Sequence, residues 1–164
     1  MTATAIADLV PHAGPMCLLD EVVDWQADRI HCRAAPRAGD SHPLYRDNKL
    51  PATALIEYAA QATAAHGTLL ARSAAHAAAP AAGRLVALRQ VELTATADAN
   101  AMPARLDVYA ERVMADAAGS IYTFRVVAGE TVLVRGRLTI HRSSGDAATG
   151  MGAIDADRAP PTPH

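Results

Sequence analysis

The chain has 164 residues, of which 51% are hydrophobic and only 4% aromatic, and its formal net charge is −2. This length fits one domain with a hydrophobic core. The small net charge gives no electrostatic reason to expect binding to nucleic acid or to an anionic membrane, and no stretch approaches the roughly 18–20 apolar residues of a membrane-spanning helix.

The two cysteines, Cys17 and Cys32, do not have the spacing of metal ligands. No positively charged residue precedes Arg29, and no apolar run is long enough for the hydrophobic part of a secretory signal. We therefore expect a cytoplasmic protein in which both cysteines are free thiols in the core rather than a disulfide.

The first elements predicted along the chain are a short helix over residues 4–10, ended by Pro11, and two strands. The strands cover residues 16–25 and 29–35, and the turn at 26–28 joins them.

The next stretch, residues 42–61, reads HPLYRDNKLPATALIEYAAQ and combines a polar loop with the start of a long helix. Pro51 suits the first helical position, where its missing N–H has no partner to lose and its φ is already helical. The helix is predicted from Ala52 to about Arg72. At 100° per residue, Glu57 shares its helix face with small or polar side chains. These are Thr53, Ala54, Ala60, Gln61, Ala64 and Thr68.

Glu57 is the acid that stands out on this helix. One interpretation is a solvated carboxylate on a half-exposed helix. Against it, no Lys or Arg occupies positions 53, 54, 60 or 61 to form a surface ion pair, and His42 lies upstream. A histidine and a carboxylate near a helix N-terminus supply a general base, a general acid and unpaired backbone amides.

The second half of the chain predicts strands at 84–96 and 104–114, followed by a hairpin of 120–128 and 131–140 around Gly129. The hydrophobic periodicity ends after Arg142, so we expect one domain over 1–142 and a disordered tail over 143–164. A long apolar helix and an antiparallel sheet each need a partner for their apolar faces. The sheet is therefore expected to curl around the helix, in an α+β fold.

The segment from His42 to Gln61 resembles the active-site segment of the beta-hydroxyacyl-[acyl carrier protein] dehydratases. In that family a His-Phe-Pro loop leads into Pro-Gly-Val-Leu-x-x-Glu-x-x-Ala-Gln, and Pro51, Leu55, Glu57, Ala60 and Gln61 match it in register. Pro43 and Ala52 replace the family's Phe and Gly, and His42 lies one residue farther from the glutamate. The variant here is most similar to a divergent branch that is linked to aryl-polyene synthesis. The resemblance implies a hotdog fold, in which an antiparallel sheet of about six strands wraps around one long central helix.

The resemblance also implies a reaction. A 3-hydroxyacyl thioester, carried on the phosphopantetheine of an acyl carrier protein or on CoA, would lose water to give the trans-2-enoyl thioester. His42 would take the α-proton and Glu57 would protonate the leaving hydroxyl, helped by burial that favours its protonated form. Backbone N–H groups near Ala52 and Thr53 would stabilise the enolate oxygen. No metal and no redox cofactor are required.

The second place of resemblance is Pro11-His12 followed by Pro15-Met16-x-Leu-Leu-Asp, which is how the first strand of the dehydratases begins. His12 is therefore a rival to His42 for any histidine role, although in the family this histidine packs near the strand entry. The acyl chain would occupy a tunnel along the small-residue face of the helix. The expected lining is Pro51, Ala54, Ala60, Gln61 and Ala64. Candidate contacts for an acidic carrier protein, each of which is also consistent with simple solvation, are Arg46, Lys49, Arg84 and Arg89.

Two alternatives remain open at this point. A hotdog thioesterase has the same fold and uses a helix carboxylate to activate water, so it would not require His42. A dehydratase-like subunit without activity of its own could instead shape the site of a partner in a hetero-oligomer. If the resemblance holds, the protein is a homodimer or higher homo-oligomer, or pairs with another dehydratase subunit, and each site combines a histidine and a glutamate from different subunits.

Overall fold

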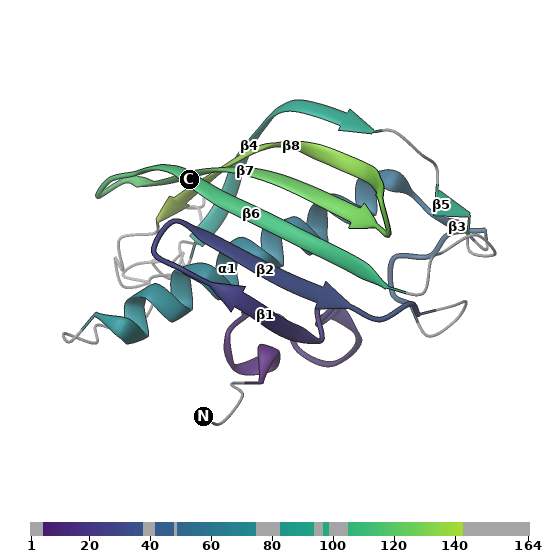
Figure 1. Cartoon of the computed structure of the whole chain (residues 1–164), viewed down its shortest axis with the longest axis horizontal. Coiled ribbons are helices and arrows are strands. Elements are labelled where there is room, and N and C mark those ends of the chain that lie inside the picture. Colours follow the sequence, from purple (N-terminus) through teal and green to yellow (C-terminus); the bar gives the residue numbers. More distant parts are fainter. Residues whose placement is uncertain are drawn as a thin grey trace, which may run out of the picture.

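The computed structural model describes residues 5–37, 42–47, 49–74, 83–93, 97–98 and 105–142, which form an antiparallel sheet and one α-helix (Figure 1). The sheet has six strands in the order β1-β2-β6-β7-β8-β4. Its strands are β1 (Glu21–Trp25), β2 (Arg29–Ala34), β4 (Gly83–Leu93), β6 (Leu106–Ala115), β7 (Gly119–Ala128) and β8 (Thr131–Arg142). A separate short pair joins β3 (Lys49–Leu50) to β5 (Ala97–Asp98). The helices are the 3-10 turns Ile6–Asp8, Gly14–Met16 and Ala52–Ala54, and α1 (Leu55–Ser73).

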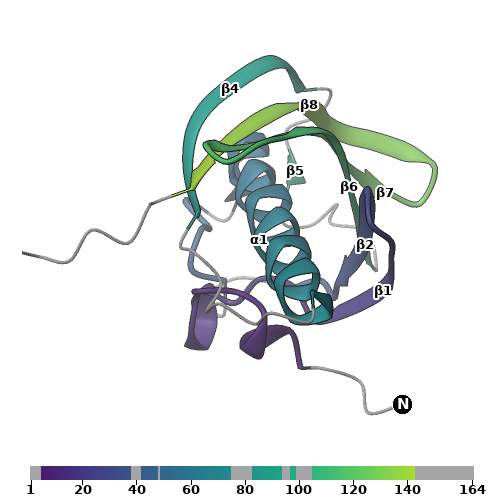
Figure 2. The same ribbon diagram turned by 90° about the vertical axis from the view of Figure 1, so that its left-hand side faces the viewer.

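The sheet curls around α1, as the view along the helix shows (Figure 2). The helix buries Leu55, Tyr58 and a row of alanines against the concave face of the sheet. Alanine is a strong helix former, and its small side chain lets a strand approach the helix closely. The larger apolar residues of this core come from the strands, among them Ile30, Val108, Phe124, Val126 and Leu138. This arrangement is the hotdog fold that the sequence predicted.

The N-terminal segment covers a part of α1 that the sheet leaves open (Figure 2). Thr68 Oγ1 donates to the carbonyl of Leu9 at 2.9 Å, and Arg72 Nη2 donates to the carbonyl of Asp8 at 2.7 Å. Leu9, Leu18 and Leu19 are buried in the same core as the helix. The segment before β1 is therefore an integral part of the core.

Two predicted elements at this end of the chain differ from the structure. The helix expected over 4–10 is the single 3-10 turn Ile6–Asp8, and the strand expected from residue 16 begins only at Glu21. Gly14 has a φ of +58° and Pro15 follows it, so the chain forms the 3-10 turn Gly14–Met16 before it can extend.

The other predicted elements are found close to their expected bounds. The hairpin of β7 and β8 turns at Gly129, whose φ of +59° is positive, as the predicted turn requires. Parts of the predicted strands at 84–96 and 104–114 and the tail at 143–164 lie outside the described residues. Cys17 and Cys32 are buried free thiols, as expected. No helix in the described ranges is long and apolar enough to cross a membrane.

Candidate active site

Glu57 lies in the first turn of α1, with 32% of its side chain exposed, so it is not the buried carboxyl that the sequence led us to expect. Two side-chain nitrogens contact the same carboxylate oxygen of Glu57, Oε1. Gln61 Nε2 lies 3.2 Å away and His12 Nε2 lies 3.1 Å away. The second oxygen, Oε2, makes no hydrogen bond to any residue that the structure describes. The carboxylate is therefore held by one oxygen and presents the other.

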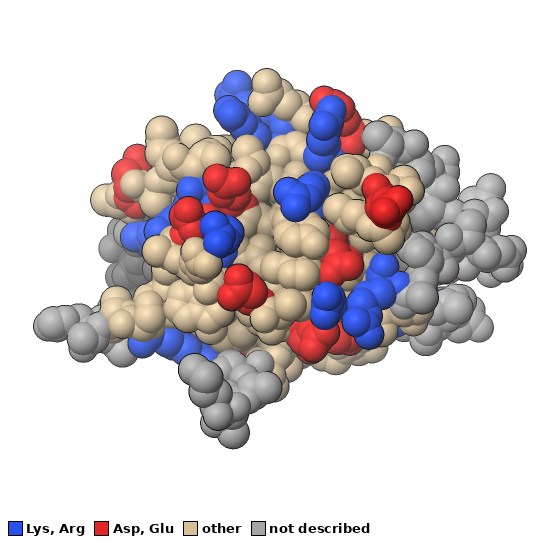
Figure 3. Space-filling view, viewed as in Figure 1, with Lys and Arg blue, Asp and Glu red and all other residues tan. Residues whose placement is uncertain are grey.

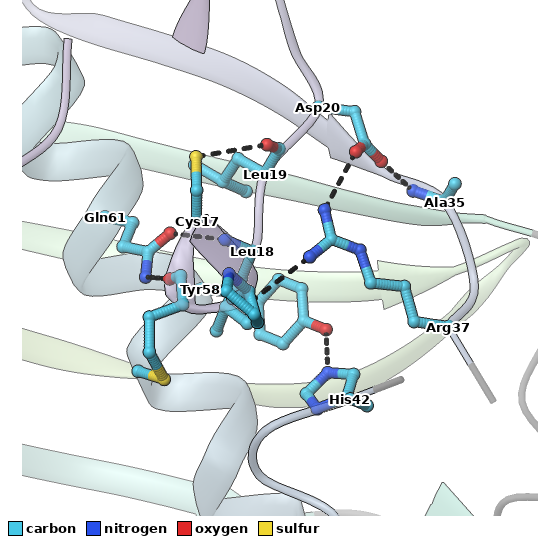
Figure 4. Close-up of polar contacts among 11 residues, drawn as sticks. Cys17, Leu18, Leu19, Asp20, Ala35, Arg37, His42, Tyr58 and Gln61 are labelled. Carbon is cyan, nitrogen blue, oxygen red and sulfur yellow. Dashed lines mark hydrogen bonds and ion pairs between the residues drawn. The ribbon is translucent and has the colours of Figure 1, made fainter. Parts of the chain in front are cut away.

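Gln61 is fully buried, and its amide is fixed at both ends (Figure 4). The backbone N–H of Leu18 donates to its Oε1 at 2.9 Å, and its Nε2 donates to the carbonyl of Met16 at 2.7 Å. These bonds determine which end of the amide is the nitrogen. Gln61 therefore acts as the donor toward Glu57, and it ties the carboxylate to the segment that precedes β1.

His42 is 3% exposed and both of its ring nitrogens have partners. Figure 4 shows the contact with Tyr58. The backbone N–H of Leu44 donates to Nδ1 at 3.1 Å, and Nε2 lies 2.6 Å from Tyr58 Oη. Because Nδ1 accepts a hydrogen bond, the proton of a neutral ring is on Nε2, which donates to Tyr58. The tyrosine, one residue after Glu57 on α1, therefore determines how the ring of His42 is held.

The electrostatic environment keeps the ring of His42 neutral. Burial, and then the positive charge of Arg37, lower the pKa of His42 below its usual value. Burial also raises the pKa of Tyr58 to about 12, so its hydroxyl keeps its proton. Arg37 itself is held by Asp20, which accepts from Arg37 Nη2 at 3.1 Å and also from the backbone N–H of Ala35 (Figure 4). A neutral imidazole is the form that a general base requires.

His42 and Glu57 of the same chain do not meet. Among the described residues, no hydrogen bond or ion pair joins them: His42 contacts Tyr58, and the histidine at Glu57 is His12. The roles that the resemblance implied for His42 and Glu57 therefore stay predictions. Within one chain the two side chains bind different partners.

The two backbone donors predicted at Ala52 and Thr53 lie at the start of the helix, and their role toward an enolate oxygen stays a prediction. Ala52 is buried and Thr53 is exposed in the 3-10 turn that precedes α1. No hydrogen bond between described residues uses the N–H of either one. Unpaired N–H groups at a helix start are suited to binding an anionic oxygen.

The predicted tunnel residues form a partly buried row along α1. Pro51, Ala54, Ala60 and Ala64 are half-buried, whereas Gln61 is fully buried and engaged by its three hydrogen bonds. These small side chains belong to the helix face that carries Glu57. The lining role of all five stays a prediction.

The candidate carrier-protein contacts come from separate elements. Arg46 is exposed in the loop before α1, where its Nη1 donates to the carbonyl of Tyr45 at 2.8 Å. Arg84 and Arg89 are exposed on the edge strand β4. Lys49 lies in β3, and its side chain is outside what the structure describes.

Within the described part of the chain, no group of three or more His, Cys, Asp or Glu side chains is placed to hold a metal ion.

Sequence reasoning missed Tyr58 and Arg37, and it left His12 as a rival only. Tyr58 stands beside Glu57 in the motif, but its contact to His42 depends on where the loop before the helix folds back. His12 is far from Glu57 in the chain, and no local pattern predicts their contact. The signal that could have found it is the resemblance of the segment around Pro11-His12 to the dehydratases.

Comparisons with known proteins agree with this fold. A family model described as ApeP dehydratase matches residues 4–151. Among solved structures, the dehydratase heterocomplex ApeI:P from Xenorhabdus doucetiae has 24% sequence identity and a TM-score of 0.76, covering 87% of this chain and 93% of that chain.

Two other structures are more distant. AziG from S. sahachiroi has 18% identity and a TM-score of 0.55, covering 76% of this chain and 90% of that one. A hypothetical thioesterase with coenzyme A from Streptococcus pneumoniae TIGR4 has 10% identity and a TM-score of 0.55, covering 75% and 84%. No curated protein matches this chain.

Proposed function

Because this chain belongs to the ApeP-like dehydratase family, we propose that it removes water from a 3-hydroxyacyl thioester on an acyl carrier protein. The product is the trans-2-enoyl thioester. The observation that carries this proposal is the state of Glu57 at the start of α1. Gln61 and His12 hold its Oε1. Its Oε2 makes no hydrogen bond to a described residue, and the carboxylate lies on the small-residue face of the helix.

The reaction needs a base, an acid and a site for negative charge. The base takes the α-proton, and the electron pair of that C–H bond moves toward the thioester carbonyl, whose oxygen becomes an enolate oxygen. The N–H groups of Ala52 and Thr53 stabilise this oxygen. The enolate then reforms the carbonyl, the double bond forms between the α- and β-carbons, and the β-hydroxyl leaves as water with a proton from Glu57 Oε2.

His42 is the proposed base, and its neutral ring suits that role. In the resting arrangement Nε2 carries the proton and donates to Tyr58, so the ring has no unoccupied lone pair. To accept the α-proton at Nε2, the ring must carry its own proton on Nδ1. The bond from Leu44 N–H to Nδ1 and the contact between Nε2 and Tyr58 Oη therefore both have to open when substrate binds.

The proposed assembly places His42 of one subunit against Glu57 of another. This is supported by the lack of contact between the two groups within one chain. It is also supported by β4, an edge strand with several apolar side chains exposed to solvent: Leu85, Val86, Leu88 and Leu93. An exposed edge with apolar side chains is a template for pairing with another sheet. The likeness to one chain of a dehydratase heterocomplex makes a second hotdog subunit the alternative partner to a second copy.

The carrier protein is proposed to approach near the loop before α1. Acidic and basic side chains alternate over the outer face of the sheet, so this face presents no single basic patch (Figure 3). Arg84 and Arg89 lie on β4, which we assign to subunit pairing, so Arg46 is the better candidate for the carrier protein. No metal or redox cofactor enters the proposed reaction.

The test is hydration of a crotonyl thioester, and dehydration of the 3-hydroxyacyl thioester, by the full chain. We expect His42→Ala and Glu57→Gln each to lower the rate by at least about 100-fold, with unchanged circular dichroism. A wild-type chain that is inactive both alone and with a second hotdog subunit would overturn the dehydratase proposal.

The thioesterase alternative is favoured by one observation, the partly exposed Glu57 carboxylate, which could activate a water molecule. It would not require His42. Full activity of His42→Ala, with release of the free acid from the thioester, would therefore establish hydrolysis in place of dehydration.

A further inference from the structure

His12 is the histidine that contacts the proposed acid. It lies in the loop between the 3-10 turns Ile6–Asp8 and Gly14–Met16, and its Nε2 is 3.1 Å from Glu57 Oε1. About a third of each side chain is exposed (33% and 32%). The contact joins the N-terminal segment to the first turn of α1, alongside the bonds that Gln61 makes to Met16 and Leu18.

The geometry limits what the His12 ring can do. Its Nδ1 is buried and has no hydrogen-bond partner among the described residues. A proton on Nδ1 would therefore be buried without an acceptor, which is costly. The neutral ring with its proton on Nε2 avoids that cost and donates to the carboxylate. With Nε2 turned to Glu57 and Nδ1 buried, His12 presents no nitrogen to a substrate.

We propose that His12 is a positioning residue for Glu57. Together with Gln61 it holds Oε1, so that Oε2 is the oxygen that faces the β-hydroxyl of the substrate. When Glu57 gives the Oε2 proton to the leaving hydroxyl, the C–O bond breaks with its electron pair and water departs. The carboxylate left behind keeps the N–H donors of His12 and Gln61 on Oε1. This role rests on the proposed dehydratase activity.

The role differs from that of a surface ion pair. The side chain of Glu57 has several rotatable bonds and is partly exposed, so without His12 it would be held by Gln61 alone. A misdirected acid lowers the rate of the chemical step, whereas the binding of the acyl chain along the helix is unchanged. The inference therefore predicts a loss in kcat with KM preserved.

The test compares two substitutions of similar length in the full chain. His12→Gln can place an N–H donor near Glu57, whereas His12→Met fills similar space without any donor. We expect His12→Met to lower kcat about 10- to 100-fold, as for a lost hydrogen bond to a charged group. His12→Gln should stay within about threefold of wild type, and both should keep KM within about twofold.

A matched control is available in the sheet. His31 Nε2 contacts Asp107 Oδ1 at 2.7 Å, so His31→Met removes a second histidine–carboxylate pair that lies outside the site. It should leave kcat unchanged. Melting temperatures of all three variants identify any general loss of folding.

The outcomes separate this inference from the proposed function. If the wild-type chain dehydrates the thioester and depends on Glu57, but His12→Met matches wild type, the positioning role is wrong and the dehydratase proposal stands. Equal losses in His12→Gln and His12→Met would also overturn it, because packing alone would then explain both. If the wild-type chain has no dehydratase activity either alone or with a second hotdog subunit, the proposed function itself fails.

Discussion

The proposed sharing of the active site between two subunits gives a prediction that can be worked out from the arrangement of two side chains. Within one chain His42 contacts Tyr58 and Glu57 contacts His12 and Gln61, so neither catalytic candidate reaches the other. If a dimer brings His42 of one subunit to Glu57 of the other, a variant lacking only one group is dead at both sites. Two variants with different defects can still complement each other.

The size of the effect follows from counting sites. When His42→Ala and Glu57→Gln chains are unfolded together and re-annealed, random pairing makes about half of the dimers mixed. In each mixed dimer one site receives both intact groups and the other receives both substitutions. Half of the dimers, each with one working site out of two, give about a quarter of wild-type activity. Each parent alone stays near zero.

The assay is hydration of a crotonyl thioester after re-annealing, with wild-type chain treated in the same way to calibrate recovery. A second control mixes Glu57→Gln chains with the double variant that carries both substitutions, and it should give no activity. Mass measurement of the intact dimers establishes that mixed pairs have formed. A mixture that contains mixed dimers and remains inactive would refute the shared site in a homodimer.

Two further predictions concern stability. Gly67 is exposed on α1 with open space around it, so Gly67→Ala should raise the free energy of unfolding by about 0.5–1 kcal/mol. A Cβ on Gly119 would lie 2.0 Å from the carbonyl oxygen of Ile140, so Gly119→Ala should lower the free energy of unfolding by about 1–3 kcal/mol or more. Urea titration measures both variants, and a reversed order of their stabilities would contradict this reasoning. Burial lowers the pKa of His66 below 6.5, so as the pH falls below about 6.5 the unfolded chain binds protons first and stability should decrease. Urea midpoints from about pH 7.5 to about pH 5.5 should fall less steeply in His66→Leu, and an equal slope would refute the assignment to His66.

The fold was predictable because its signals are local. The helix from Leu55 to Ser73 follows from a long run of helix-forming residues after Pro51, and the β7–β8 hairpin follows from alternation around Gly129. The pairing of β3 with β5 could not be predicted, since each has only two residues and they lie far apart in the chain. Such a pair has no periodicity of its own and depends on where the surrounding loops fold.

The candidate site was predictable in its residue types but not in its contacts. The motif indicated that Glu57, Gln61 and His42 belong together, and the structure shows Gln61 beside Glu57, one helical turn away. The contact between His12 and Glu57 crosses most of the N-terminal half of the chain, and the contact between His42 and Tyr58 depends on the path of the loop. Contacts of this kind are fixed by tertiary packing and leave no local pattern in the sequence.

The position of the site follows from how the sheet leaves one side of the helix open. The segment before β1 covers that side, and because it is not a strand, the carbonyl of Met16 and the N–H of Leu18 have no partners in the sheet. Unpaired backbone groups in a buried place are costly, and Gln61 supplies a donor to one and an acceptor to the other. The same amide nitrogen also contacts Glu57. The side chain that satisfies the buried backbone groups here is therefore the one that orients the carboxylate. The geometry of the site thus depends on the packing of the N-terminal segment.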